Sequence, residues 1–337
     1  MCGIVGICSN LSIESRDWLT VGRDAMRHRG PDGEGMYWAA DYRVGFAHRR
    51  LAIVDLTDSG SQPMRSRDGK LCITYNGEIY NFKELRRELI SGGESFLSSS
   101  DTEVILAAYR KWGKDFITRL HGMFAFAIHD QTTNTVLLAR DRAGEKPLFY
   151  RHFGGELRFG SELKALLTDP AMPRRVDRLA LDCYLSMGFI PGEHCILEET
   201  RKLPPAHALI FDCDSGAIKV WRYWDIPELE TERVSLSDGA LLEHFETLLA
   251  EAVKRQLVAD VPVGLLLSGG VDSSLITALA AQCNSQINTY SVGFRDFPEY
   301  DETHHAELVA KHFGTNHSTL YADSVTPELL PLLARQY

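Results

Sequence analysis

The chain carries a cysteine in second position, and this residue has the chemistry of a nucleophile. Cysteine is small enough for the initiator Met1 to be removed, which would make Cys2 the first residue. Its thiol would then sit beside a free α-amine. The reference pKa of that amine, about 7.7–8.0, is close to working pH, so the amine could act as general base to its own side chain. Residues 4–7 predict a buried strand that would fix this nucleophile. Many proteins begin with Met-Cys by chance, and these residues alone favour that explanation.

Arginines within an apolar segment form a second group of candidates. Residues 44–55 are mostly apolar but contain His48, Arg49 and Arg50. A buried guanidinium needs a partner, because an unpaired buried charge is very costly. The partner could be a substrate carboxylate, which matches the guanidinium fork, or an acidic side chain of the protein. From this segment alone, the internal salt bridge is the simpler interpretation. Residues 27–33, with two arginines and a histidine, are interpreted equally well as a solvated turn or as a loop that carries cations toward an anionic or amide substrate.

Two further segments supply hydrogen-bond donors and a carboxylate. A predicted strand runs into Asn76-Gly77, a dipeptide typical of a hairpin turn, but the residues after it look helical. An asparagine amide beside a glycine N–H could stabilise one developing negative charge, as in an oxyanion hole. Ser100 begins a predicted helix and is expected to form a capping box with Glu103. That role leaves the Asp101 carboxylate available for a substrate ammonium.

The last candidate site is a Ser- and Gly-rich loop between an apolar strand and a helix. Residues 261–267 are a continuous apolar run, as expected of a parallel strand buried on both faces, and residues 268–274 are Ser-Gly-Gly-Val-Asp-Ser-Ser. Such a loop at a helix N-terminus surrounds a phosphate-sized anion with backbone N–H groups. It is neither a Walker A loop, whose lysine is missing, nor G-x-G-x-x-G. Ser and Gly amides together with Asp272, which is suited to Mg²⁺, favour pyrophosphate as a leaving group, and hence adenylation of a carboxylate over transfer of a γ-phosphate.

Composition restricts the classes of protein to which the chain can belong. Its 337 residues suggest two domains, and its formal net charge of −10 argues against a nucleic-acid binder. Seven cysteines without a C-x-x-C pair argue against a disulfide framework or a zinc ribbon. No basic region followed by an apolar run marks a signal peptide, and no apolar run is long enough to span a membrane. We expect a reducing, cytoplasmic compartment and no membrane contact.

The order of the predicted elements indicates two domains joined by a linker. Residues 1–224 alternate hairpins with helices, which predicts an α+β domain of antiparallel sheets covered by helices. Residues 225–236 are acidic and poorly patterned, as in a linker. Residues 237–337 predict an open α/β sheet whose carboxyl edge binds a nucleotide. Its predicted elements are an amphipathic helix at 237–256 and strands at 261–267, 288–294 and 317–321, with helices between them.

Together these motifs resemble those of glutamine-dependent asparagine synthetases of the asparagine synthetase B type, and the resemblance covers essentially the whole chain. The matching segments are residues 1–4, 27–32, 48–55, 76–81, 100–104 and 268–274. Their order and combination are highly specific, although no single segment would suffice. The resemblance implies a four-layer αββα domain of the N-terminal nucleophile type that hydrolyses glutamine. It also implies an α/β domain of the PP-loop ATP pyrophosphatase type that adenylates aspartate with ATP and Mg²⁺, which is then amidated to asparagine by the ammonia.

The resemblance also implies roles for individual residues. Cys2 would be the nucleophile, with its α-amine as base, and Asn76 and Gly77 would form the oxyanion hole. Arg50 would hold the glutamine α-carboxylate and Glu78 and Asp101 its α-ammonium, while Asn76 and the Ile53 and Val54 backbones line the pocket. In the second domain, adenosine and pyrophosphate would contact Leu266, Ser268, Gly269, Gly270, Asp272, Ser273, Val292 and Gly293, with Asp272 on Mg²⁺. No prosthetic group is implied, and the family analogy suggests a homodimer. For Arg50, the substrate replaces the internal salt bridge as the expected partner.

One departure from the family concerns the second domain. Family members continue into an Asp-Glu-Pro-Phe-Ala-Asp segment and a Ser-Gly-Glu-Gly-Ser-Asp-Glu loop, which supply acidic metal and aspartate contacts, and neither occurs here. Three predicted strands are also few for a nucleotide-binding sheet. We therefore expect a fragment or truncated product with a complete glutaminase half and an incomplete synthetase half. The alternatives are amidation of another carboxylate, for instance on a sugar or peptide, glutaminase activity only, and a non-catalytic regulatory protein that binds ATP or glutamine.

Overall fold

The computed structural model of the chain describes residues 1–228, 236–284, 286–322 and 327–336. Its contacts divide the chain into two units, Met1–Glu228 and Leu229–Tyr337, each of which is described by itself. The predicted linker, residues 225–236, falls at this division, and residues 229–235 lie outside the described part. Among the described helices, none is both long and apolar enough to cross a membrane.

The first unit contains two six-stranded sheets, in which neighbouring strands are antiparallel. In the first sheet the order is β10 (Arg201–Lys202), β8 (Phe149–Phe153), β9 (Glu156–Gly160), β1 (Gly3–Ser9), β3 (Val44–Arg50) and β2 (Gly33–Trp38). In the second sheet it is β12 (Ile218–Arg222), β11 (His207–Asp212), β7 (Thr135–Arg140), β6 (Gly122–Asp130), β5 (Leu71–Ile79) and β4 (Met64–Arg65).

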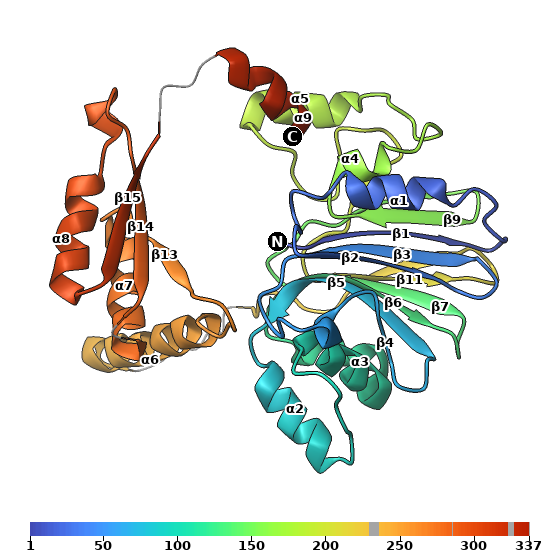
Figure 1. Ribbon diagram of the computed structural model, residues 1–337, viewed down its shortest axis with the longest axis horizontal. Helices are drawn as coiled ribbons and strands as arrows, with labels where there is room; N and C mark the ends of the chain where they lie inside the picture. The colour runs from blue at the N-terminus through green and yellow to red at the C-terminus, as the bar shows by residue number, and fades with distance from the viewer. Residues whose placement is uncertain (229–235, 285, 323–326, 337) are drawn as a thin grey trace. The chain divides into compact units, whose positions relative to one another are not determined.

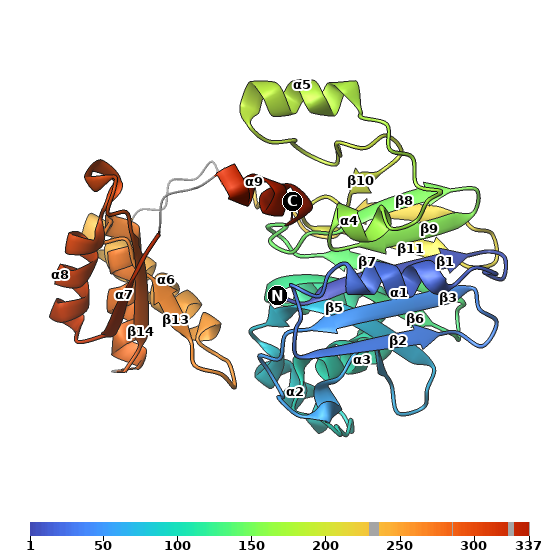
Figure 2. The same ribbon diagram turned by 45° about the horizontal axis from the view of Figure 1, so that its top comes forward.

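Helices cover the outer faces of both sheets (Figure 1). The first sheet carries α1 (Asp17–Asp24) and α4 (Leu163–Leu166), and the second carries α3 (Asp101–Trp112), against which α2 (Phe82–Ser91) packs. This arrangement confirms the predicted αββα layers. A further helix, α5 (Arg178–Met187), lies outside the layers (Figure 2). Short 3₁₀ helices occur in the first unit at η1 (Asp58–Gly60) and η2 (Gly113–Arg119), and in the second unit at η3 (Pro298–Tyr300) and η4 (Pro327–Leu329).

Strand β1 is apolar throughout because it is buried on both faces. Side chains alternate along a strand, so Ile4 and Cys8 enter the core between the two sheets. Val5 and Ile7 point the other way and pack with α1. The residues that follow Cys2 are thereby fixed in a central strand between two layers of packing, as the sequence predicts.

Two local predictions near the site need correction or refinement. Strand β5 runs straight through Asn76-Gly77 and pairs with β6 as far as Ile79, so the dipeptide forms no turn. Ser100 does cap α3 by accepting a hydrogen bond from the Thr102 N–H (3.1 Å). The capping box is wrong, however, because the Glu103 carboxylate accepts the N–H groups of residues 97 and 98 instead of that of Ser100.

The second unit contains one parallel sheet, with the order β13 (Gly264–Leu266), β14 (Asn288–Gly293) and β15 (Asn316–Tyr321). Its helices are α6 (Asp238–Gln256), α7 (Val271–Cys283), α8 (Thr303–Phe313) and α9 (Leu330–Gln336). The predicted α/β class is confirmed. The expectation of a strand at 261–267 buried on both faces is wrong, because β13 is shorter and the described residues cover only one face of the sheet.

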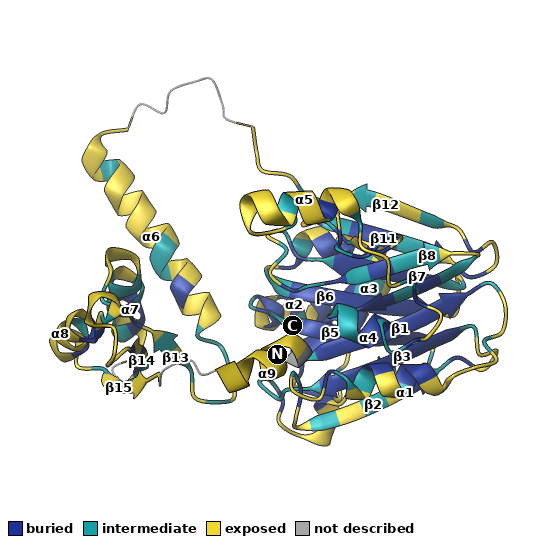
Figure 3. Cartoon of the chain, turned by 90° about the horizontal axis from the view of Figure 1, so that it is seen from above, coloured by how far each residue is buried: buried dark blue, intermediate teal, exposed yellow. Residues whose placement is uncertain are grey.

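Burial differs on the two faces of this sheet. Leu265 packs with α7, and Thr289 and Ser291 on the same face are buried. On the other face, Leu266 and Val292 are exposed. Leu320 of β15, which pairs with Val292, is exposed as well. The predicted apolar face of α6 is likewise exposed over its first half, and the only buried residue of that helix is Val253 (Figure 3).

Candidate active site

Cys2 lies at the start of β1, where backbone groups hold its side chain. Its Sγ accepts a hydrogen bond from the Leu51 N–H (3.3 Å) and lies 3.5 Å from the Leu51 carbonyl oxygen, to which the thiol can donate. Leu51 directly follows β3, which pairs with β1. Burial raises the pKa of the Cys2 thiol. The thiol is therefore neutral near pH 7 and needs a base to become a nucleophile.

The charged turn at residues 27–33 anchors the cysteine rather than a substrate. Arg29 donates from Nε to the Cys2 carbonyl oxygen (2.9 Å) and from Nη1 to Glu162 (2.8 Å). His28 and Lys164 also lie 3.0 Å from the Glu162 carboxylate. Neither alternative describes His28 and Arg29, whose side chains converge on one internal carboxylate, whereas Arg27 is exposed. The sequence offers no signal for Glu162, which is 133 residues from Arg29.

The neighbouring arginines at the end of β3 have different partners. Arg49 pairs with Asp24 (2.5 Å) and Glu34 (2.6 Å), so the internal salt bridge predicted for this segment belongs to Arg49. Arg50 instead donates to the backbone carbonyls of Asp55 and Thr57. Successive residues of a strand face opposite sides, which explains why only Arg50 reaches the pocket beside Cys2.

One pocket of the first unit brings the predicted residues together. It is lined by Cys2, Arg50, Leu51, Ile53, Val54, Gly60, Gln62, Tyr75, Gly77, Glu78, Ser100, Asp101 and Thr102. All predicted residues of the glutaminase site are among them except Asn76, which is buried beside the pocket in β5. Six lining residues were not predicted to belong to the site: Leu51, Gly60, Gln62, Tyr75, Ser100 and Thr102. A β-carbon at Gly60 would overlap the Arg50 guanidinium and lie 2.8 Å from the Asp55 carbonyl oxygen, so a larger residue would displace Arg50 or its loop, and nothing in the spacing of Gly60 could have shown this.

The edge of β5 presents a backbone donor to this pocket. The Tyr75 N–H donates to the Gln62 side-chain oxygen (2.7 Å), and the Ile79 N–H donates to Asp101 Oδ2 (3.0 Å). In an antiparallel strand, alternate N–H groups point to the same side, so the Gly77 N–H lies on this edge between the other two. Asn76 is 1 % exposed, and its Nδ2 has no hydrogen-bond partner among the described residues. An amide and a backbone N–H adjacent in sequence are the donors expected of an oxyanion hole.

Asp101 supplies a buried carboxylate at the start of α3. It is 4 % exposed, and its Oδ2 accepts hydrogen bonds from the Tyr75 hydroxyl (2.8 Å) and the Ile79 N–H. Burial raises the pKa of Asp101, against the opposing effect of these hydrogen bonds. An ammonium in the pocket would stabilise the ionised form, because an opposite charge offsets the cost of burial. Glu78 lines the same pocket and adds a second carboxylate.

The Asp55 carboxylate stabilises the loop whose Asp55 and Thr57 carbonyls accept hydrogen bonds from Arg50. The sequence analysis predicts no role for Asp55. Its carboxylate accepts hydrogen bonds from the Thr57 hydroxyl (2.6 Å), the Ser59 hydroxyl (3.0 Å) and the Ser99 N–H (2.8 Å). Although burial acts in the opposite direction, these hydrogen bonds lower the pKa of Asp55 to about 2. Asp55 is followed by a hydroxyl residue two positions later, a pattern typical of a side-chain-stabilised turn that could have revealed it.

In the second unit, the predicted nucleotide-binding residues gather at the carboxyl edge of the sheet. Residues 268–273 follow β13, and Val292 and Gly293 end the adjacent parallel strand β14. The Ser268 and Ser273 hydroxyls lie 3.1 Å apart, and Ser268 Oγ accepts the Gly270 N–H (3.3 Å). Gly269 has φ +86°, and a β-carbon there would lie 2.5 Å from His305 in α8. The glycine thus allows the loop to approach α8 closely.

Asp272 lies in the first turn of α7, beside this loop. Within the described residues, no group of three or more His, Cys, Asp or Glu side chains is placed to hold a metal ion. Mg²⁺ in nucleotide sites is usually held by one or two carboxylates together with substrate phosphates. A single carboxylate next to the predicted phosphate-binding loop therefore fits such a site.

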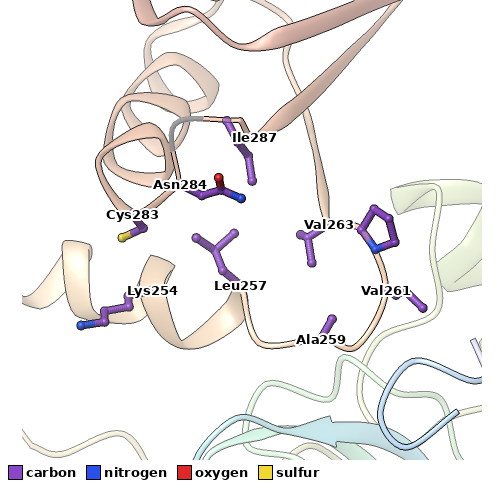
Figure 4. A pocket seen from close by; sticks show the side chains of 9 residues that line it. Lys254, Leu257, Ala259, Val261, Val263, Cys283, Asn284 and Ile287 are labelled. Atoms are coloured by element: carbon purple, nitrogen blue, oxygen red, sulfur yellow. The ribbon is translucent and has the colours of Figure 1, made fainter.

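A second pocket of this unit has a volume of about 460 Å³ (Figure 4). Its lining residues are Lys254, Leu257, Ala259, Val261, Pro262, Val263, Cys283, Asn284 and Ile287. These precede β13 and β14 or end α6 and α7, which places the pocket at the amino ends of the parallel strands. Nucleotides bind at the carboxyl ends of such sheets, so this pocket is not the nucleotide site.

Comparison with known proteins agrees with the two units. The family model for the glutamine amidotransferase domain matches residues 1–224, and that for asparagine synthase matches residues 244–333. Similar proteins include glutamine-hydrolyzing asparagine synthetase 3 of Bacillus subtilis (38 % identity; 94 % of this chain and 53 % of that protein). Another is putative glutamine-hydrolyzing asparagine synthetase 2 of Methanocaldococcus jannaschii (37 % identity; 95 % and 65 %). The chain thus spans about half to two thirds of the length of these relatives.

A solved structure supports the fold alone. It is described as the allosteric regulatory enzyme of purine biosynthesis, with a TM-score of 0.50 and 15 % sequence identity over 95 % of this chain and 80 % of that one. The amidotransferase family model covers most of the chain and establishes the family, and the Cys2 pocket lies within the matched residues. The chain belongs to the family of proteins with a glutamine amidotransferase domain, and its second unit matches the asparagine synthase family.

Proposed function

We propose that the chain releases ammonia from L-glutamine at Cys2 and uses it, with ATP, to convert L-aspartate to L-asparagine. The observation that carries this proposal is a single pocket that holds a thiol, a guanidinium, two carboxylates and a strand-edge N–H. Glutamine has a side-chain amide, an α-carboxylate and an α-ammonium, and each of these groups has a complementary partner in that pocket.

In the proposed reaction, removal of Met1 frees the α-amine of Cys2, which takes the thiol proton as Sγ attacks the glutamine side-chain carbonyl. The oxyanion that develops would be stabilised by the Gly77 N–H and the Asn76 amide. The protonated amine then gives its proton to the departing ammonia, which leaves a thioester on Cys2. Water attacks this thioester, releases glutamate and restores the thiol.

Substrate orientation would come from Arg50 and the acidic side chains. Arg50 already donates two hydrogen bonds to the backbone carbonyls of Asp55 and Thr57. Its remaining N–H groups would hold the α-carboxylate of glutamine. Asp101 and Glu78 would hold the α-ammonium, and the backbones of Ile53 and Val54 would close the pocket. The ion pairs of Arg49 with Asp24 and Glu34 leave Arg50 as the arginine of this segment that would face the substrate.

In the second unit, ATP would contact Leu266, Val292 and Gly293 with its adenosine and residues 268–273 with its phosphates. A Mg²⁺ ion near Asp272 would supply positive charge to the phosphates when bound. A homodimer and a cytoplasmic location are also part of the proposal; the first rests on family analogy and the second on composition. No separate prosthetic group is required.

Two assays on one preparation test the proposal. Glutamate release from glutamine should be abolished by Cys2→Ala and unchanged in the matched variant Cys183→Ala, whose thiol lies in α5. Persistent turnover in Cys2→Ala would overturn the nucleophile assignment. Aspartate-dependent exchange of pyrophosphate into ATP tests the second half. Glutaminase activity without exchange would restrict the function of this chain to ammonia release and leave the amide acceptor to be found.

A further inference from the structure

Lys146 is a buried lysine whose backbone is held from both sides. The Asp141 carboxylate accepts hydrogen bonds from the N–H groups of Ala143 (3.1 Å), Glu145 (2.9 Å) and Lys146 (3.0 Å). Arg140 donates from Nε to the Lys146 carbonyl oxygen (2.7 Å). Asp141 is 1 % exposed and Lys146 is 5 % exposed. The loop between β7 and β8 therefore fixes the position of this lysine.

The Lys146 ammonium points to the N-terminal residue of the chain. Among the described residues it makes one hydrogen bond, to Met1 Sδ at 3.2 Å. A thioether is a weak acceptor, and burial of an ammonium against a weak acceptor is unfavourable. Burial correspondingly lowers the pKa of Lys146. The sequence analysis gave this residue no role, and the proposed function does not use it.

Removal of Met1 changes what this ammonium faces. The sulfur that accepts its hydrogen bond leaves with Met1, and the new α-amine is created on the adjacent residue, Cys2. We propose that Lys146 is a positioning residue that keeps the α-amine of Cys2 in its free-base form, because two neighbouring positive charges repel each other. This inference rests on the proposed function, in which that amine is the general base.

The charges around the N-terminus favour this role. Burial, together with the positive charges of Arg29 and Lys146, lowers the pKa of the present N-terminal amine, whereas Cys2 and Asp32 act in the opposite direction. Arg29 is already paired with Glu162. Asp32 accepts the Ala52 N–H (2.9 Å).

Carboxylates act on Lys146 as well. Glu145, Glu78 and Asp141 raise the pKa of its ammonium, although the effect of burial is larger. Glu78 and Asp101 face the Cys2 thiol and would raise its pKa. In the proposed function both of these carboxylates are occupied by the glutamine ammonium. Lys146 then remains as a cation near the amine that is not consumed by substrate binding.

The test compares Lys146→Met, Lys146→Gln and Lys146→Arg in the full chain, after mass spectrometry has confirmed that Met1 is absent. In the two neutral variants, we expect the acid limb of kcat/KM for glutamine to move up by about 1 pH unit, a shift typical of one nearby charge. This corresponds to a loss of about tenfold at pH 6 and to values near wild type above pH 9. Lys146→Arg should keep the wild-type profile, and so should Lys219→Met, which changes an exposed lysine of β12.

A second readout does not depend on turnover. In protein labelled with ¹⁵N-cysteine, the chemical shift of the Cys2 amine reports its pKa directly, and that pKa should rise in Lys146→Met and Lys146→Gln alone. An unchanged amine pKa, or an equal loss of kcat/KM at every pH, would overturn the inference. If wild type shows no Cys2-dependent glutamate release, the proposed function fails, while the amine titration still decides the role of Lys146.

Discussion

In the first unit the residues around Cys2 are buried and held by partners from distant parts of the chain, whereas in the second unit the Ser268–Ser273 loop lies at an exposed sheet edge. Asp101 is fixed by Tyr75 and Ile79, and the Cys2 carbonyl by Arg29. The hydrogen bonds of the second loop are made among its own serines and glycines. The difference teaches that the pocket around Cys2 is preorganised by distant partners, while the loop is held by its own hydrogen bonds and by its close approach to α8.

Burial shows the same contrast. Both faces of β1 are packed, because one faces the second sheet and the other faces α1. In the second unit, one face of the parallel sheet exposes Leu266 and Val292. A parallel sheet is normally covered on both faces. Substitutions that act through packing should therefore have larger effects in the first unit than in the second.

The largest effect is expected for Gly77→Ala in β5. A β-carbon at this position would overlap the Met123 carbonyl oxygen and approach Phe124 Cα to 2.8 Å. The strand edge would have to move, and with it the proposed oxyanion donor, so we expect glutaminase kcat to fall on the order of 10³-fold. Steady-state assays measure this fall. Gly160→Ala in β9 is the control, since its nearest neighbours lie at 3.6 Å. Equal activity in both variants would contradict a preorganised edge.

A smaller effect is expected for Gly269→Ala in the second unit. The new β-carbon would meet His305 and Ala306 of α8, and φ +86° is unfavourable for alanine. We expect a loss of about 2 kcal/mol in the stability of this unit, typical of an overpacked site. Hydrogen exchange in α7 and α8 measures it. Gly270→Ala is the matched control, because its nearest neighbour, at 3.4 Å, is the flexible Ser268 side chain. Similar exchange in the two variants would show that the loop does not depend on its contact with α8.

The smallest effect concerns the pH dependence of stability in the first unit. His48 is fully buried and bonded through Nδ1 to Thr74 (3.3 Å), and burial lowers its pKa from 6.5 to about 3. Between these values only the unfolded state binds the proton, so the free energy of unfolding falls as the pH falls, by about 1 kcal/mol per pH unit. His129, whose pKa burial lowers to about 4, adds a second such contribution. His48→Asn should therefore halve the slope between pH 6.5 and 4.5.

Tryptophan fluorescence during urea unfolding measures this slope for the first unit by itself. All five tryptophans, at positions 18, 38, 112, 221 and 224, belong to that unit. His129→Asn provides the matched control and should reduce the slope by a similar amount. If His48→Asn shifts the midpoint equally at every pH, the histidine is protonated in the folded state and the assignment of its pKa is wrong.

Sequence patterns were sufficient where the chemistry depends on residue type and local order. The buried strand after Cys2, the Ser-Gly loop between a parallel strand and a helix, and the α+β class of the first unit follow from short-range apolar periodicity and turn residues, whereas the four αββα layers were implied by the family resemblance. The same reasoning proposed Asp101 and Gly77, and the family resemblance added Arg50; the structure brings all three into one pocket. It failed for the capping box of Glu103 and for the burial of the second sheet. Neither the hydrogen-bond partner of a side chain nor the packing of other elements on a sheet face is set by neighbouring residues in the sequence.

The sequence by itself determined the candidate nucleophile, the phosphate-type loop and the division into two units, because each depends on a few neighbouring residues. Only the tertiary structure gave the physical reason why Arg50 and not Arg49 faces the pocket, since Arg49 pairs with Asp24 and Glu34. It also placed Lys146 beside the N-terminus, 145 residues from Met1. Such contacts are set by sheet register and layer packing, which bring together residues that no local spacing connects.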